Sequence, residues 1–135
     1  MKIKKTKLIQ SVIFVALAIT LLLVSINLIN QTEHAKDNGY IIVSFKNEDH
    51  MITKKVEYTI GDNLMDLITH NFNNVSIIES SYGPFLFGIE DYVTPSNYET
   101  YLGLYVDDVY SLVGINQIEL KNEITILIKV EKAWK

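Results

Sequence analysis

Cysteine and arginine are both absent from this chain of 135 residues. Without cysteine the protein has no disulfide, no thiol nucleophile and no N-terminal cysteine for lipid attachment. A folded domain of this chain is therefore held by its hydrophobic core alone, which suits a bacterial surface better than a small secreted animal module. All Lys and Arg positions are lysine, and Asn and Ile are abundant. Both features are typical of an AT-biased genome.

Charge is missing from the stretch Leu8 to Ile29, and four lysines precede it. As a helix this stretch reaches roughly 33 Å, enough to cross a hydrocarbon core of about 30 Å. The preceding lysines place the N-terminus in the cytoplasm and the later residues outside. The run is longer than the apolar region of a cleavable signal and ends without an Ala-x-Ala pattern, which favours an uncleaved signal anchor; a cleaved signal sequence is the alternative.

Four segments are expected from this pattern: a basic cytoplasmic segment at 1–7, a single-pass anchor at 8–29, a stalk at 30–39 and an extracytoplasmic domain at 40–135. The protein is expected at the cell membrane, or secreted if the anchor is cleaved. Residues 1–30 carry +4 of a total of −4, so the remaining residues carry −8. An acidic domain repels phosphate backbones, which argues against a nucleic-acid partner.

Hydrophobic periodicity predicts an α+β domain. Strand patterns at 40–45 and 51–60 form a hairpin, with Ile52, Val56, Tyr58 and Ile60 on one face. A helix follows from Asp62, the expected N-cap, to about Asn71. Further strands are expected at 75–79, 82–89, 101–106, 109–113 and 124–130, with a loop at 90–100 and a tight turn at 107–108. This order is typical of a β-grasp-like mixed sheet packed on one helix.

The runs GDNLMDLI, YGPFLFGIED and YLGLYVDDVYSLVGINQIELKNEITILIKVE resemble the transcobalamin-like C-terminal domain family, a bacterial domain of unknown function. The resemblance covers about residues 40–131. The matching positions are Gly61, Leu64, Leu67, Ile68, Tyr82, Gly83, Ile89, Tyr105, Val106, Gly114 and Ile115. The chain departs from the family where Asp107-Asp108 replaces Asn-Gly, where 121–123 replaces a Gly-Asp turn, and where Tyr101 stands for a frequent Trp. Asp-Asp is a poorer turn because Asp tolerates positive φ less easily than Gly.

In the vertebrate cobalamin carriers, a domain of this fold covers one face of a corrinoid that is held mostly by a helical domain. That helical domain has no counterpart in this sequence. The resemblance implies a membrane-anchored module that captures a corrinoid or another vitamin for an importer. Cobalamin enters only as a speculative ligand, and no cofactor is expected.

Motifs of catalysis and metal binding are missing from the sequence. The three histidines, His34, His50 and His70, do not have the spacing of metal ligands. The acidic pairs at 90–91 and 107–108 fall in turns, without a calcium-loop pattern. There is no phosphate-binding Gly-rich loop and no Gly-x-Ser-x-Gly nucleophile elbow. We therefore expect no catalytic residue, no metal site and no enzymatic activity; an enzyme, which would need a pocket with converging polar groups, is kept as a third alternative.

Tyrosine is concentrated between Tyr82 and Gly114. The candidate ligand-binding residues are Tyr82, Tyr92, Tyr98, Tyr101 and Tyr105, because a tyrosine offers a flat apolar body with a polar tip. For the three on strands, 82, 101 and 105, packing within the sheet is the favoured reading. For Tyr92 and Tyr98, in the expected loop at 90–100, packing and recognition are both open. The alternative function is a protein-interaction module that docks on a transporter or envelope protein through a sheet edge.

Overall fold

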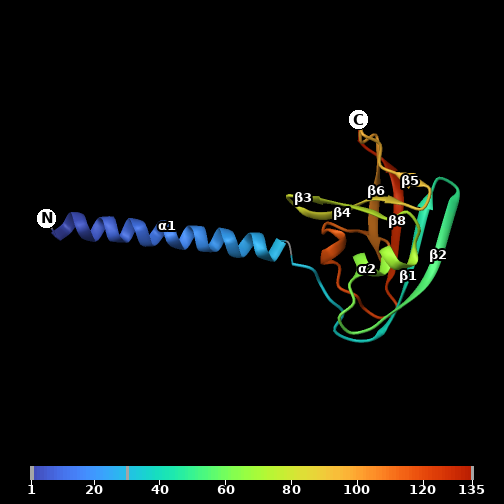
Figure 1. Cartoon of the computed structure of the whole chain (residues 1–135), viewed down its shortest axis with the longest axis horizontal. Coiled ribbons are helices and arrows are strands. Elements are labelled where there is room, and N and C mark those ends of the chain that lie inside the picture. Colours follow the sequence, from blue (N-terminus) through green and yellow to red (C-terminus); the bar gives the residue numbers. More distant parts are fainter. Residues whose placement is uncertain (1, 30, 135) are drawn as a thin grey trace. The chain divides into compact units, whose positions relative to one another are not determined.

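The computed structural model describes residues 2–29 and 31–134, with side chains described for 4–24 and 31–134. The chain divides into two compact units, Met1–Gln31 and Thr32–Lys135. The first unit is the helix α1 (Lys2–Ile29), drawn in blue in Figure 1. The second is the folded domain that contains all of the strands.

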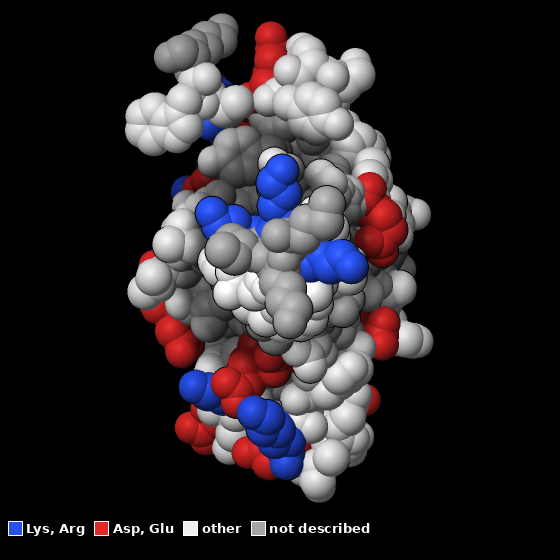
Figure 2. All heavy atoms as spheres, turned by 90° about the vertical axis from the view of Figure 1, so that its left-hand side faces the viewer, with Lys and Arg blue, Asp and Glu red and all other residues white. Residues whose placement is uncertain are grey.

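Helix α1 is long and apolar enough, over Lys4–Val24, to be a membrane anchor or a signal sequence. Its described apolar side chains are exposed, as expected for a segment that does not belong to a protein core. Figure 2 looks onto the N-terminal end of α1, where lysine side chains gather, while acidic side chains are scattered over the folded domain. The direction in which α1 crosses a membrane stays a prediction.

The larger sheet of the folded domain has five strands in the order β2-β1-β8-β6-β7 (Figure 1). Strands β1 and β8 run parallel at its centre, and the other neighbours are antiparallel. The bounds are β1 (Gly39–Asn47), β2 (His50–Tyr58), β6 (Thr100–Val106), β7 (Val109–Tyr110) and β8 (Thr125–Lys132). The α+β class expected from the sequence is thereby confirmed.

One face of this sheet forms the core. Alternate residues of β1 and β8 are buried, among them Val43, Phe45, Ile126 and Ile128, because successive side chains of a strand point to opposite faces. The segment before β1 also contributes: Ala35 is buried, and its N–H donates to the Asp62 carbonyl at 2.6 Å. Part of the segment expected as a stalk therefore packs within the domain, whereas residue 30 lies outside the described residues.

Helix α2 (Leu64–Asn71) inserts Leu64 and Ile68 into this core. Its N-cap is Asn63, whose side-chain oxygen accepts from the Asp66 N–H at 3.0 Å. The expectation that Asp62 caps the helix was wrong, because its carboxylate instead accepts from the Thr59 N–H at 2.9 Å and closes the turn after β2.

The second strand ends earlier than the sequence suggested. Its alternation places Val56 and Tyr58 in the core as expected. Strand β2 ends at Tyr58, so Ile60, expected on the same face, lies in the following turn and is exposed. The turn interrupts the alternation, which is why the parity rule fails at that residue.

A second, three-stranded sheet has the order β3-β4-β5, a division into two sheets that the sequence did not predict. Its strands are β3 (Ser76–Ser80), β4 (Gly83–Ile89) and β5 (Tyr92–Val93). The expected loop at 90–100 therefore contains a short strand, β5, which pairs with Gly88 and Ile89 of β4. A short helix, η1 (Ile115–Gln117), follows the larger sheet's β7.

The tight turn between β6 and β7 forms at Asp107-Asp108, as expected. Both residues have positive φ, 46° and 66°, as a two-residue type I′ hairpin requires. The Asp107 carboxylate also accepts from the Thr125 N–H at 2.9 Å, a contact to β8 that glycine could not make. The partner strand expected at 109–113 is shorter, because β7 ends at Tyr110.

Candidate functional site

Two hollows lie beside β6, and Tyr101 and Tyr110 line both of them. Tyr101, Gly103 and Tyr105 point to the outer face of the larger sheet, whereas Leu102 and Leu104 point to the core face. The outer hollow, which we call the tyrosine trough, has a volume of about 740 Å³ and is lined by Tyr101, Tyr105, Tyr110, Lys129, Val130, Glu131, Lys132 and Trp134. The other, which we call the edge groove, has about 240 Å³.

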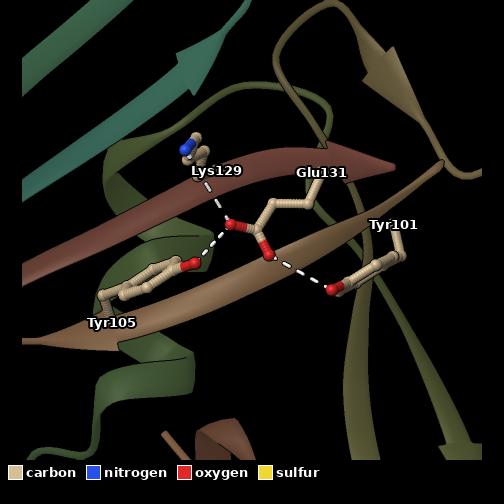
Figure 3. Close-up of polar contacts among 4 residues, drawn as sticks. All are labelled: Tyr101, Tyr105, Lys129 and Glu131. Carbon is tan, nitrogen blue, oxygen red and sulfur yellow. Dashed lines mark hydrogen bonds and ion pairs between the residues drawn. The ribbon is translucent and has the colours of Figure 1, made fainter. Parts of the chain in front are cut away.

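Glu131 is the centre of the tyrosine trough (Figure 3). The Tyr101 hydroxyl donates to its Oε2 at 3.1 Å, and the Tyr105 hydroxyl donates to its Oε1. Lys129 Nζ lies 3.9 Å from the same Oε1, and the Glu131 side chain is 18% exposed. Register explains the meeting, because Tyr101 pairs with Glu131 across the antiparallel strands β6 and β8.

Gly103 makes room for this carboxylate. A Cβ atom at this position would lie 2.7 Å from Glu131 Oε2, which is closer than van der Waals contact allows. The side chain of Glu131 therefore lies over the bare backbone of Gly103, between the two tyrosines (Figure 3). The run Tyr-Leu-Gly-Leu-Tyr thus provides two phenols and the gap between them.

Hydrogen bonding to Glu131 raises the pKa of Tyr105 from 10.0 to about 12, with burial and the carboxylate charge adding to the shift. The pKa of Tyr101 is raised as well, first by burial and then by its hydrogen bond to Glu131. Both phenols are consequently protonated at neutral pH and act as hydrogen-bond donors. The arrangement orients two aromatic rings instead of supplying a phenolate base.

Aromatic surface surrounds this polar centre. The rings of Tyr105 and Tyr110 pack edge to face, with centroids 5.4 Å apart and planes at 79°. Trp134, the only tryptophan of the chain, also lines the trough and is 98% exposed. Flat aromatic faces beside a fixed carboxylate can stack on a planar ligand and accept a hydrogen bond from it.

The edge groove lies on the other side of β6, between the two sheets. Its walls are mainly apolar and include Phe85 and Leu86 of β4, Leu104 of β6, and Val113 and Ile115 from the segment after β7. Ile128 of β8 also lines it. Tyr98, which has a positive φ of 53° and an exposed ring, lies at its rim.

The five tyrosines named from the sequence have different surroundings. Tyr101 and Tyr105 meet at Glu131, and Tyr98 lines the edge groove. Tyr82, in the turn between β3 and β4, is 86% exposed and lines neither hollow. Tyr92 is buried on β5, and its hydroxyl lies 3.0 Å from Thr100 Oγ1. A role of any of the five in binding stays a prediction.

Sequence reasoning missed Gly103, Tyr110, Glu131 and Trp134. Alternation could have placed Glu131 on the outer face of the last strand, because Ile126 and Ile128 of the same strand point to the core face. Its meeting with Tyr101 depends on strand register, which is a long-range property. Among residues 2–29 and 31–134, no group of three or more His, Asp or Glu is placed to hold a metal ion.

The fold defines a class: the folded domain has a transcobalamin-like fold. It is similar to haptocorrin, solved in complex with Cbi, at 15% identity and a TM-score of 0.64, over 73% of this chain and 26% of haptocorrin. It is also similar to a protein of Ruminococcus gnavus ATCC 29149 provisionally described as metal binding, at 11% identity and a TM-score of 0.63, over 71% of this chain and 99% of that protein. These identities establish the fold alone.

The model of the Domain of unknown function DUF4430 matches residues 61–132, more than half of the chain. The chain therefore belongs to this family. No match was found among the curated proteins. The chain spans about a quarter of haptocorrin's length, 26%.

Proposed function

We propose that the chain is a membrane-anchored, extracytoplasmic, non-enzymatic binding module whose tyrosine trough takes a small planar ligand, such as a corrinoid or another vitamin, for delivery to an importer. The trough itself carries this proposal. Its volume of about 740 Å³ lies within the roughly 300–1,000 Å³ of common small-molecule sites. Tyr105, Tyr110 and Trp134 supply stacking surface, and Glu131 supplies a fixed acceptor.

Two further observations support the proposal. Helix α1 has the length and composition of an anchor, which would keep the domain at the membrane beside an importer. The larger sheet with α2 on its core face is β-grasp-like in our interpretation, and the fold is shared with haptocorrin, which was solved with Cbi bound. Only the similarity to haptocorrin suggests a corrinoid as the ligand, so the ligand screen has to include other planar vitamins.

Trp134 provides the readout for the test. The full-length chain in detergent micelles is titrated with cobalamins and other planar vitamins, while the emission of this single tryptophan and the heat of binding are recorded. Saturable binding is expected, and Tyr105→Ala should weaken it by about tenfold or more because a stacking ring is lost. Tyr82→Ala, at an exposed ring outside the trough, is the matched control. Absence of any saturable signal at millimolar ligand contradicts the proposal.

A second candidate function is a protein-interaction module that docks on a transporter or envelope protein through a sheet edge. One observation favours it: β7 pairs with only the last two residues of β6. The rest of that side of β6 borders the edge groove. Crosslinking in intact cells that captures no membrane or envelope protein above background contradicts this alternative.

A further inference from the structure

Strand β6 is paired along its whole length on one side only. On that side, β8 pairs with every residue from Thr100 to Val106. On the other side, β7 pairs with Tyr105 and Val106 and then ends. In the part of the chain that the structure describes, no strand pairs with the first residues of β6 on this second side. This half of the strand is a sheet edge.

The backbone of Leu102 faces that edge. The N–H of Ser111 donates to the Leu104 carbonyl at 2.8 Å, so the polar groups of Leu104 point toward β7. On the opposite side, the Asp107 N–H donates to the Thr125 carbonyl at 2.9 Å, so the odd-numbered residues point toward β8. Backbone groups of alternate residues point the same way, and the N–H and C=O of Leu102 therefore point out of the open edge.

The edge lacks the protection that exposed strands commonly carry. Proteins blunt such edges with lysine, proline or a bulge. The sequence of β6, TYLGLYV, has no charged residue and no proline, and its register with β8 is continuous. The described segment after β7 forms no further strand on this side of β6. It borders the edge groove through Ser111, Val113 and Ile115, and it carries two exposed apolar side chains, Leu112 and Val113.

The edge groove adjoins these backbone groups. Its volume of about 240 Å³ is below the roughly 300 Å³ at which small-molecule sites begin, so it suits one or two aliphatic side chains better than a whole vitamin. Leu102 lines it, and Ile115 and Ile128 are buried at its inner side. A peptide extended along the edge would place alternate side chains into this groove while its backbone pairs with β6.

The net negative charge of the folded domain favours a cationic partner at the edge over a second copy of the domain. Residues 31–135 carry −8, which follows from the total of −4 and the +4 of residues 1–30. A second copy of this domain brings the same negative charge, so edge-to-edge pairing of two copies works against repulsion. A cationic segment is attracted instead.

We propose that the open edge of β6 binds an extended, cationic peptide segment of a partner protein by strand addition at Leu102, with an aliphatic side chain seated in the edge groove. This binding is separate from that of a small ligand in the tyrosine trough and does not depend on it. The partner is defined by three properties: extended backbone, positive charge and aliphatic residues at alternate positions.

The test uses the full-length chain in detergent micelles and the synthetic peptide acetyl-KVKLKVK-amide. NMR hydrogen exchange should show that the Leu102 amide proton, which no described strand pairs with in the free chain, becomes protected when the peptide binds. The same peptide N-methylated at its three central amides loses donors on both of its edges and should bind at least about tenfold more weakly. A peptide with glutamate in place of lysine should bind more weakly still, because the domain is acidic.

A pair of variants locates the binding. Val113→Lys places a positive charge and a longer side chain at the rim of the groove and should lower affinity for the cationic peptide by about tenfold or more. Leu112→Lys makes the same chemical change at the neighbouring residue, which is 94% exposed and does not line the groove. It should leave the affinity within about twofold, as expected of an exposed position.

Four results overturn the proposal. The first is absence of peptide binding at millimolar concentration, and the second is binding without protection of the Leu102 amide. The third is equal affinity of the N-methylated peptide, which would assign binding to side chains alone. The fourth is a dimer in sedimentation, with Leu102 already protected in the free chain, which would assign the edge to a second copy.

Discussion

The tyrosine trough and the edge groove border the same strand and have opposite chemistry. In the trough, the polar groups satisfy one another: two phenols donate to Glu131, and Lys129 lies beside it. In the groove, the walls are apolar, and the polar groups of Leu102 point out of an unpaired edge. The alternating sequence of β6 therefore contributes to two different sites. In the trough the polar side chains are already hydrogen-bonded to one another, whereas at the edge groove the backbone N–H and C=O of Leu102 have no partner among the described strands.

The difference suggests different ligands. A site whose polar groups are already bonded to one another offers stacking area and a fixed acceptor, which suits a small planar molecule. A site with free backbone groups gains most from a partner that brings its own backbone. Both depend on β8, which holds β6 in register and supplies Glu131 to one side and Ile128 to the other.

The largest expected effect comes from removing that shared support. Ile128 is 1% exposed and lines the edge groove. Ile128→Ala should lower the free energy of unfolding by about 2–5 kcal/mol, whereas Ile128→Val should cost about 0.5–1.5 kcal/mol. Denaturant unfolding of the full-length chain measures both. A loss from Ile128→Ala no larger than that from Ile128→Val would show that the site is not packed as described.

Glu131→Gln should remove the carboxylate that holds the two phenols in the trough, and it should leave the edge groove unchanged because Glu131 does not line it. Without the carboxylate, the pKa of Tyr105 should fall from about 12 back toward 10.0. NMR titration of the tyrosine ring carbons measures this fall. Glu119→Gln is the control, because Glu119 is an exposed carboxylate paired with Lys36 outside the trough. An unchanged Tyr105 pKa in Glu131→Gln would contradict the hydrogen bond between Tyr105 and Glu131.

The hydrogen bond between Tyr105 and Glu131 also predicts that the stability of the domain depends on pH in the alkaline range. The pKa of Tyr105 is higher in the folded chain, about 12, than its ordinary value of 10.0. Its contribution to stability is therefore fully present below about pH 10 and is lost as the pH rises through about 12. Glu131→Gln should flatten this part of the stability curve. A wild-type curve without such a decline would count against the hydrogen bond.

The smallest expected effect concerns the hairpin that ends the open edge. Asp108 has a positive φ of 66°, so Asp108→Gly should relieve strain and raise the free energy of unfolding by about 0.5–1 kcal/mol. Thermal unfolding measures the gain. Asp49→Gly, in the turn between β1 and β2 where Asp49 has no positive φ, should give no gain. Equal effects of the two variants would contradict the type I′ geometry.

Local patterns predicted most of the elements. The alternation of β1, β2 and β8 and the helical spacing of Leu64 and Ile68 were sufficient to define them. Boundaries failed where two neighbours can do the same work: Asp62 and Asn63 are both good caps, and only the fold decides which one does so. The short strand β5 was missed because two residues carry no periodicity.

The site was only partly predictable, for a different reason. Tyr92 stands in a polar stretch that suggests exposure, yet its pairing with Ile89 carries it into the core. Glu131 has no local partner, and its role follows from the register that sets it opposite Tyr101. Register, sheet division and the early end of β7 are tertiary properties. The groove depends on all three, so the sequence alone did not predict it.

The contrast between the two sides of β6 can be measured directly by hydrogen exchange of its backbone amides in the free full-length chain. We expect slow exchange at Tyr101, Gly103 and Tyr105, whose amides point toward β8, and fast exchange at Leu102, whose amide points out of the open edge. Protection of Leu102 equal to that of Gly103 would show that the edge is already covered and would contradict an open edge at β6.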